Sequence, residues 1–330
     1  MKLVTAPAQP SPARVEDGPG RRLTVGVVQM HWEADAARHA ATLAKGIGLA
    51  AGAGAQVVFL PELTLSRYPA DTRPEGRPAD LAEPLEGGPT HTFAAAAAAE
   101  HGVLVHASLY EQAPGPAGED GLGYNTAILV DPAGRIVART RKLHIPVTEG
   151  YFEDLYFRHG PADEPYPVHQ VDLPGSPRLG LPTCWDQWFP ELARAYSLAD
   201  AEVLAYPTAI GSEPDHPDFD TQPLWQSVIV GNGIANGLFM AVPNRWGDEG
   251  RISFYGSSFV SDPYGRVLGQ APREGDHVLV AELDLDQRAD WLALFPFLET
   301  RRPDTYTGLV DASGRAAGRG SCLLAPGRLG

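Results

Sequence analysis

The 330-residue chain is poor in cysteine, in basic residues and in long apolar runs. Its two cysteines, Cys184 and Cys322, cannot form a disulfide framework, and so few cysteines are typical of proteins from a reducing compartment. The first residues hold no apolar core of signal-peptide length, and no stretch of about 18 apolar residues occurs. We therefore expect neither a secretion signal nor a transmembrane helix, and a cytoplasmic location.

Positive charge is also scarce. Lysine and arginine total 26, against 41 aspartates and glutamates, which gives a net charge of −15. A nucleic-acid-binding protein or a protein that binds an anionic membrane would present a basic face, so the balance argues against both kinds of partner. A small neutral or cationic molecule remains a suitable partner, and the 43% of hydrophobic residues are enough to form a sizeable core.

The two ends of the chain differ from its middle. Residues 1–21 are rich in proline, glycine, alanine and charge without periodicity, so we predict a disordered N-terminal tail. Residues 312–330 are rich in glycine, arginine and proline and are predicted to form a loose C-terminal tail. No linker divides residues 22–311, which we take as a single domain.

Short apolar runs alternate with helical stretches in this domain, and two Asp-Pro-x-Gly-Arg turns indicate hairpins. Because hairpins interrupt the strand–helix alternation, we predict an α/β fold of two mixed sheets packed together, with helices outside. The predicted helices are 36–53, 90–100, 189–198 and 221–235. The predicted strands are 23–30, 56–62, 102–110, 125–131, 135–143, 178–184, 201–207, 238–244, 253–262, 266–270 and 277–284.

Three predicted strands end in a reactive side chain. Glu62 follows an apolar strand, where loss of water would make its carboxylate a usable general base. Lys142 could stabilise a developing oxyanion, and Cys184 lies before a predicted helix, a position that favours a thiolate nucleophile. Each residue alone also fits an ordinary surface or packing role. Together they form a complete set for nucleophilic catalysis, which only the fold can assemble.

Other signals are weaker. The glycines of VIVGNGIANG (228–237) leave no room for the helix of a dinucleotide-binding fold, and the ten histidines show no metal-binding spacing. His144 is an alternative base for Cys184, whereas Cys322, in a glycine-rich segment, has no expected catalytic role. The acidic loop 213–220 is either a solvated loop or a binding site for a cation, with these candidates: Glu213, Asp215, Asp218 and Asp220.

The segments around the three reactive residues resemble the carbon–nitrogen hydrolase (nitrilase) superfamily. The Glu of FLPEL, the Lys of RKLHIP and the Cys of CWDQWFPE match that family's Glu-Lys-Cys triad in order and in flanking residues. The resemblance extends over about residues 23–310 and is strongest to the N-carbamoylputrescine amidase branch. Further segments that carry it are KLHIPVTEGYFEDLYF (142–157), CWDQWFPELARAYSLADAEVLAYPTAIGSEP (184–214), FYGSSFVSDPYGRVL (254–268) and RRPDTY (301–306).

The resemblance implies an α-β-β-α sandwich that pairs into a homodimer or a larger homo-oligomer, and a hydrolase that needs no cofactor or metal. It implies that Glu62 is the general base, Lys142 the oxyanion-stabilising cation and Cys184 the nucleophile. Glu153, in GYFEDLYF, matches the family's second glutamate, which orients the lysine and the substrate. The backbone N–H of Trp185 would complete the oxyanion hole.

The implied reaction is hydrolysis of an N-carbamoyl amine to the amine, CO₂ and ammonia, with Trp185, Asp186 and Glu213 in contact with the substrate. An N-carbamoyl amino acid or N-carbamoyl-β-alanine is an alternative substrate, whose carboxylate would need an arginine such as Arg67 or Arg245. The net charge of −15 favours a cationic substrate instead. A simple aliphatic amide and a non-catalytic nitrilase-like scaffold are further alternatives, although the intact triad argues against a scaffold.

The sequence departs from the N-carbamoylputrescine amidase branch in two places. The segment after Glu62 is LTLSRYPADTRPEGRP, without the aromatic-Cys-Gln run that the branch tends to show. Pro182 and Thr183 precede the cysteine where the branch usually has aliphatic residues. The identity of the substrate therefore stays open at this point.

Overall fold

The computed structural model describes residues 1–15, 20–116 and 118–310. Residues Met1–Leu294 form one compact unit, which ends earlier than the domain boundary expected at residue 311, and the chain from Phe295 forms a second unit. The second unit holds two short 3₁₀ helices, Pro303–Thr305 and Thr307–Val310. Cys322 and the C-terminal tail expected at 312–330 lie outside the described residues. No helix in the described ranges combines the length and apolar character that a membrane span requires.

The larger sheet of the compact unit has seven strands, and its central strands are parallel. In spatial order they are β1 (Lys2–Ala6), β17 (His277–Asp284), β2 (Arg22–Gln29), β3 (Val57–Phe59), β4 (Leu104–Glu111), β5 (Tyr124–Val130) and β6 (Ile136–Arg141). Strands β2, β3 and β4 are parallel, and β5 and β6 are each antiparallel to the strand before. Strands β3 and β6 therefore end at the same edge of the sheet.

The second sheet has six strands, and its central strands are also parallel. In spatial order they are β16 (Val267–Gln270), β15 (Phe259–Ser261), β12 (Phe239–Val242), β11 (Val203–Ala205), β10 (Arg178–Gly180) and β9 (Val168–Gln170). Strands β10, β11 and β12 are parallel, so their carboxyl ends share one edge. Two small ribbons pair β13 (Trp246–Asp248) with β14 (Ser253–Tyr255) and β7 (Val147–Thr148) with β8 (Tyr151–Phe152).

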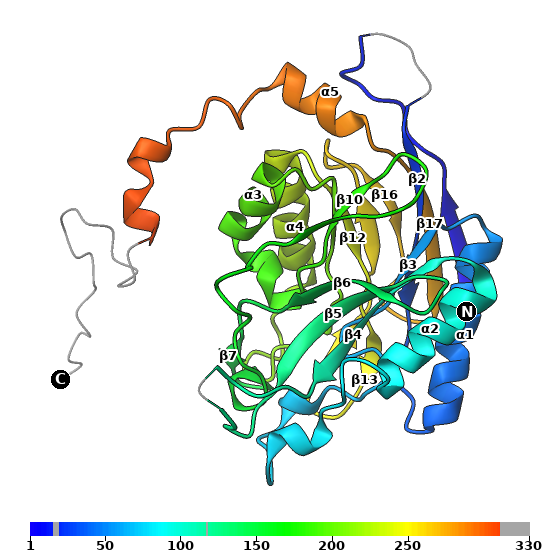
Figure 1. Cartoon of the computed structure of the whole chain (residues 1–330), viewed down its shortest axis with the longest axis vertical. Helices are drawn as coiled ribbons and strands as arrows, with labels where there is room; N and C mark the ends of the chain where they lie inside the picture. The colour runs from blue at the N-terminus through cyan, green and yellow to red at the C-terminus, as the bar shows by residue number, and fades with distance from the viewer. Residues whose placement is uncertain (16–19, 117, 311–330) are drawn as a thin grey trace. The chain divides into compact units, whose positions relative to one another are not determined.

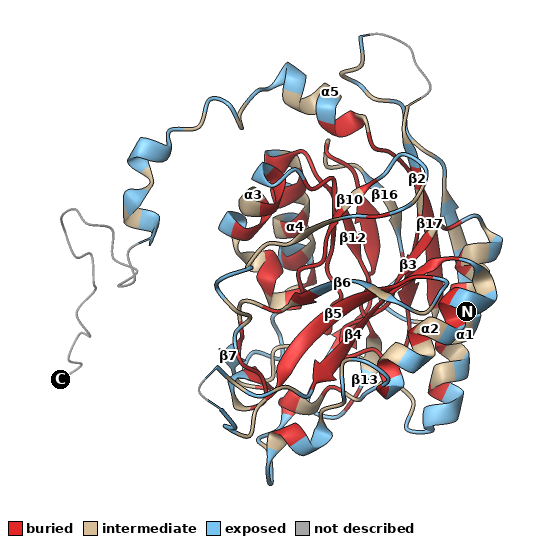
Figure 2. Ribbon diagram, viewed as in Figure 1, coloured by how far each residue is buried: buried red, intermediate tan, exposed pale blue. Residues whose placement is uncertain are grey.

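Helices cover the outer face of each sheet, so the compact unit is an α-β-β-α sandwich, as the resemblance implied (Figure 1). Helices α1 (Ala36–Gly52) and α2 (Pro89–His101) pack on the seven-stranded sheet, and α3 (Pro190–Leu198) and α4 (Gln222–Asn236) on the six-stranded sheet. The sheets face each other across an apolar core that includes Phe59 and Val203. Figure 2 shows the buried strands between these helices. A fifth helix, α5 (Gln287–Leu294), ends the compact unit.

Local sequence signals explain several boundaries. The side chain of Asp35 caps α1 by accepting hydrogen bonds from the N–H groups of Ala37 and Arg38. Both hairpin turns are closed in the same way, because the first aspartate of each Asp-Pro-x-Gly-Arg turn accepts the N–H of the arginine four residues later. The predicted hairpins β5–β6 and β15–β16 are confirmed by these turns and by antiparallel pairing.

Two predictions are wrong. Lys2–Ala6 is not disordered but forms the edge strand β1, because it finds hydrogen-bond partners along β17, which is remote in sequence. The single strand predicted over 253–262 is two strands in different sheets, β14 and β15. Gly256 and Ser257, at φ +56° and +57°, break the extended backbone between them.

Candidate active site

Glu62 lies just after β3, at the edge where the parallel strands end. Its side chain is fully buried, and each carboxylate oxygen has hydrogen-bond donors. Oε1 accepts from Asn125 Nδ2 at 2.7 Å and from Lys142 Nζ at 2.9 Å, and Oε2 accepts the N–H of Ala209 at 2.9 Å. Ala209 follows β11 of the other sheet, so the two sheet edges meet at this carboxylate.

Lys142 directly follows β6, and its ammonium lies between two carboxylates. Its Nζ donates to Glu153 Oε2 at 2.6 Å as well as to Glu62, and all three side chains are buried. Burial alone would lower the pKa of Lys142, but the charges of Glu153 and Glu62 outweigh it and raise this pKa. The lysine therefore stays cationic at neutral pH.

Glu153 begins a short 3₁₀ helix, Glu153–Leu155, and has a second partner in Tyr68. The Tyr68 hydroxyl donates to Glu153 Oε1 at 2.8 Å. Burial raises the pKa of Glu153 to about 7, although the charge of Lys142 opposes the shift. The Lys142 ammonium therefore lies between two buried carboxyl groups, and that of Glu153 has a raised pKa.

Cys184 is the first residue of the 3₁₀ helix Cys184–Trp188, which begins shortly after the end of β10. Its φ of +39° is unusual for a residue other than glycine, and the residue is 5% exposed. Burial and then the charge of Glu62 raise the pKa of this thiol well above its ordinary value, while Lys142 acts in the opposite direction. We expected the start of a helix to favour a thiolate at Cys184. Instead, burial has the larger effect and favours the neutral thiol, since α3 begins at Pro190, six residues further along the chain.

A cavity of about 360 Å³ opens onto Cys184 and Glu153. Its walls are mostly apolar, and a few polar groups are placed among them. The apolar lining consists of Pro146, Tyr151, Trp185, Trp188, Ile210, Phe219 and Leu224. The remaining lining residues are Thr148, Glu153, Cys184, Glu213, His216 and Thr221. A cavity of this size and lining fits a small organic substrate.

Comparison with known proteins assigns the family. The model for the carbon–nitrogen hydrolase family matches residues 24–292. The chain belongs to the carbon–nitrogen hydrolase family. It is similar to citrullinase of Francisella tularensis, with 34% identity over 87% of this chain and 98% of that protein. Its similarity to N-carbamoylputrescine amidase of Solanum lycopersicum is 34% identity over 89% of this chain and 97% of that one.

Solved structures agree with this assignment. A carbon–nitrogen hydrolase from Helicobacter pylori G27 superimposes with a TM-score of 0.79 at 31% identity, covering 88% of this chain and 99% of that one. Nit3 of Saccharomyces cerevisiae, at 22% identity, shares the fold with a TM-score of 0.70 over 86% of this chain and 97% of its own. The resemblance to the nitrilase superfamily and its N-carbamoylputrescine amidase branch is confirmed, and the enzyme is a hydrolase of the amidase type.

Of the three residues expected to contact the substrate in this carbon–nitrogen hydrolase, two lie in the cavity wall. Trp185 and Glu213 line the cavity, but Asp186 does not. The Asp186 carboxylate accepts the N–H of Thr183, the residue before the 3₁₀ helix, at 3.0 Å and pairs with His144 Nδ1 at 2.7 Å. Asp186 therefore caps the helix that carries Cys184, contrary to our expectation. His144 is held by this pair and by stacking on Phe189, so it is not placed as the base for the thiol.

Neither arginine proposed for a substrate carboxylate reaches the cavity. Arg67 pairs with Asp71, and Arg245 is buried against Glu249. The described residues that line the cavity include no arginine or lysine.

The acidic loop divides between two cavities. Glu213 faces the cavity of Cys184, and burial raises the pKa of its carboxyl group. Asp218 and Asp220 line a neighbouring cavity of about 550 Å³, where Asp220 pairs with Arg273 at 2.6 Å. Asp215 is exposed. Of the four candidates, only Glu213 is placed to meet a substrate that occupies the site of Cys184.

Two residues of the site were missed from the sequence. Asn125 lies in β5 between Tyr124 and Thr126, and its amide donates to Glu62. The signal in the sequence was an amide side chain in a predicted strand that is mostly apolar. Tyr68 falls in the segment that departs from the branch pattern, and only the fold reveals that its hydroxyl reaches Glu153.

Proposed function

We propose that this enzyme is a cysteine-dependent amidohydrolase that cleaves the terminal C–N bond of a small N-carbamoyl amine and releases ammonia. The observation that supports it is the buried cluster of Glu62, Lys142, Glu153 and Cys184, of which Glu153 and Cys184 line the cavity. A protonated thiol beside a carboxylate base and a fixed ammonium is suited to nucleophilic attack on a carbonyl group.

In the first half of the reaction, Glu62 takes the thiol proton as the sulfur of Cys184 attacks the carbonyl carbon. Lys142 and the backbone N–H of Trp185 stabilise the oxyanion of the tetrahedral intermediate. Glu153 holds the lysine by its 2.6 Å ion pair. The intermediate collapses, Glu62 returns the proton to the leaving nitrogen, and ammonia departs from a carbamoyl thioester.

In the second half, Glu62 removes a proton from water, and the hydroxide attacks the thioester. The C–S bond breaks, the thiol is restored and a carbamate is released. The carbamate then loses CO₂ to give the free amine. The step uses only groups already placed in the cluster, and one carboxylate acts as both base and acid.

Glu213 supports a substrate with a cationic distal end. Its half-buried carboxylate lies in the cavity wall, where the Thr221 hydroxyl donates to it at 3.3 Å. A primary ammonium that leaves water needs such an acceptor to replace its hydration. N-carbamoylputrescine, a butyl chain with a ureido group at one end and an ammonium at the other, has this chemistry, and similar enzymes act as N-carbamoylputrescine amidases.

Citrulline is the competing substrate, because one similar protein is a citrullinase. Citrulline has a ureido group and an ammonium as well, but its α-carboxylate would face a cavity in which His216 is the sole basic side chain among the described lining residues. Placing that carboxylate near Glu213 is unfavourable. We therefore favour the carbamoylated diamine.

The test is ammonia release from N-carbamoylputrescine, citrulline, N-carbamoyl-β-alanine, N-pentylurea and simple aliphatic amides. N-pentylurea has a methyl group where N-carbamoylputrescine has its ammonium, so the pair isolates the distal charge. We expect the highest kcat/KM for N-carbamoylputrescine. Ammonia release from none of the ureido compounds would contradict the proposal, and a preference for citrulline would reassign the distal site.

Glu213→Gln tests the distal contact directly. Loss of a desolvated charge partner costs about 2–5 kcal/mol, so we expect kcat/KM for N-carbamoylputrescine to fall at least about tenfold, with little change for N-pentylurea. Asp218→Asn, in the same loop but facing the other cavity, is the matched control. Equal losses on both substrates would show that Glu213 acts through shape rather than charge.

A further inference from the structure

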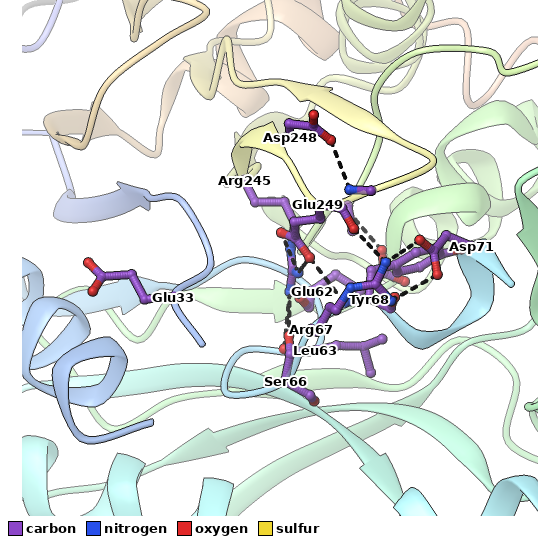
Figure 3. Close-up of polar contacts among 12 residues, drawn as sticks. Glu33, Glu62, Leu63, Ser66, Arg67, Tyr68, Asp71, Arg245, Asp248 and Glu249 are labelled. Atoms are coloured by element: carbon purple, nitrogen blue, oxygen red, sulfur yellow. Dashed lines mark hydrogen bonds and ion pairs between the residues drawn. The ribbon is translucent and has the colours of Figure 1, made fainter. Parts of the chain in front are cut away.

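Arg245 is a buried cation that the reaction above does not use. It follows β12 of the six-stranded sheet, is 3% exposed, and lies between Glu249 and the loop that carries Glu62 (Figure 3). Its Nη1 donates to both carboxylate oxygens of Glu249, at 2.9 and 2.8 Å. Removing two charges from water costs free energy, so a buried Arg245–Glu249 ion pair beside the active site suggests that the pair has a function there.

The other nitrogen of the guanidinium holds the Glu62 loop. Nη2 donates to the backbone carbonyls of Glu62 at 2.7 Å, Leu63 at 3.1 Å and Ser66 at 3.1 Å. This loop has no regular secondary structure up to Tyr68, and Leu63 has a φ of +49°. Arg245 thus supplies donors that a helix or strand would otherwise provide.

Glu249 extends the contact to the second glutamate. Its Oε2 accepts the N–H of Tyr68 at 3.2 Å, and the Tyr68 hydroxyl donates to Glu153. Arg67, the residue before Tyr68, also donates to the backbone carbonyl of Glu249. The pair Arg245–Glu249 therefore holds both ends of the segment 62–68, and through it both carboxyl groups that contact Lys142.

The neighbouring residue acts on the opposite side of the base. Asn244 Oδ1 accepts the N–H of Ile210 at 3.2 Å, and its Nδ2 donates to the Ile210 carbonyl at 3.1 Å. Ile210 follows Ala209, whose N–H donates to Glu62 Oε2. Consecutive residues after β12 thus fix the main chain on both sides of the Glu62 carboxylate.

We propose that Arg245, with Glu249, is a positioning residue that fixes the general base Glu62 and the Tyr68–Glu153 contact for catalysis. This inference rests on the proposed role of Glu62. Lysine cannot replace arginine here, because its one nitrogen cannot donate to a carboxylate on one side and three carbonyls on the other.

Arg245→Lys keeps the charge and removes this geometry. Misplacement of a catalytic group by about 1 Å can cost about 100-fold in rate, so we expect kcat for N-carbamoylputrescine to fall at least about tenfold with KM changed less than about threefold. Alkylation of Cys184 by iodoacetamide, followed by intact mass, should slow in parallel, because it also depends on the placement of Glu62. Glu249→Gln should show a smaller loss of the same kind.

Arg288→Lys is the matched control. Arg288 is 6% exposed and donates to the backbone carbonyls of Ser197, Asn236 and Gly237, away from the site. It should lose thermal stability as Arg245→Lys does but keep kcat within about twofold of the wild type. Both variants are assayed at a temperature where circular dichroism shows them folded.

Three outcomes would overturn the inference. The first is an Arg245→Lys enzyme with the kcat and alkylation rate of the control. The second is a rise in KM confined to substrates that carry a carboxylate, which would make Arg245 a substrate ligand. The third is an Arg245→Lys chain that does not fold while Glu249→Gln folds with unchanged kcat. If the wild type releases no ammonia from any ureido compound, the proposed function fails separately, and the alkylation rates still test the placement of Glu62.

Discussion

Burial controls the chemistry of individual residues in this enzyme. Water is excluded from Glu62, Lys142 and Glu153, so their charges act on one another at close range. The same exclusion keeps Cys184 as a neutral thiol, since burial raises its pKa. In the proposed mechanism, the thiolate of Cys184 therefore forms only during the attack, by proton transfer to Glu62. Several hydrogen bonds hold the Glu62 carboxylate in place, which supports this role.

His106 shows the cost of the same effect away from the site. Its ring is fully buried in β4, 5.4 Å from the ring of Phe59, and neither ring nitrogen has a hydrogen-bond partner. Burial lowers its pKa to about 3. The unfolded chain binds a proton below about pH 6.5 that the folded chain does not, so stability falls as the pH falls from 6.5 towards 3.

Replacement of this histidine should flatten the pH dependence of stability. Between pH 7 and pH 5, His106 accounts for a loss of about 2 kcal/mol in the free energy of unfolding, and His106→Leu should abolish that share. Urea unfolding at the two pH values measures it. His159→Gln, at an exposed position, is the control and should leave the difference unchanged. A His106→Leu protein with the wild-type pH dependence would contradict the assignment.

At the same scale, the sequence predicted reactive residues better than their supports. Glu62, Lys142 and Cys184 were identifiable because each is a reactive residue type at the end of a predicted strand. Glu153 came from the resemblance alone, and Asn125 and Tyr68 were missed. Their roles depend on contacts over 63 and 85 residues of sequence, which no local pattern encodes.

At the scale of elements, the site depends on where strands end. Strands β3 and β6 of one sheet and β10, β11 and β12 of the other lead into the residues of the cluster and its supports. Each lead-out segment is irregular, and Leu63 and Cys184 adopt positive φ. Such backbone is stable only when the surroundings supply its hydrogen bonds, as Arg245 and Asn244 do.

A substitution at Gly256 tests whether the backbone conformation of this residue separates strand β14 from strand β15. It has φ +56°, and a Cβ there would lie 2.2 Å from the carbonyl oxygen of Arg273. Gly256→Ala should lower the free energy of unfolding by more than about 1 kcal/mol. Gly231→Ala, in the exposed part of α4 with nothing within 4 Å, should instead raise it by about 0.5–1 kcal/mol. Thermal unfolding of both variants measures these changes. If Gly256→Ala left the stability unchanged, the positive φ of Gly256 would not be what separates β14 from β15.

Regular elements were predictable because their signals are local. The helices α1 to α4 and the two Asp-Pro-x-Gly-Arg hairpins follow from composition, spacing and turn chemistry. The edge strand β1 and the division of 253–262 do not, because each depends on a distant partner: β17 for the first, and two different sheets for the second. Tertiary pairing decided these cases against the local pattern.

At the scale of the whole molecule, we propose a homodimer or larger homo-oligomer in which the segment from Pro303 contacts the partner chain. This segment carries Leu309 at 69% and Val310 at 84% exposure. Exposed apolar side chains of this kind are typical of an interface. Light scattering at micromolar concentration should report at least a dimer, and a chain that ends after Arg302 should associate more weakly. A monomeric full-length chain would contradict the proposal.

The central claim is that Cys184 attacks the ureido carbon of an N-carbamoyl amine, with Glu62 as its base. The most direct measurement is the release of ammonia and putrescine from N-carbamoylputrescine by the wild type, Cys184→Ala and Cys322→Ala. We predict equimolar ammonia and putrescine from the wild type and from Cys322→Ala, and none from a folded Cys184→Ala. Turnover by Cys184→Ala within several-fold of the wild type would contradict the account.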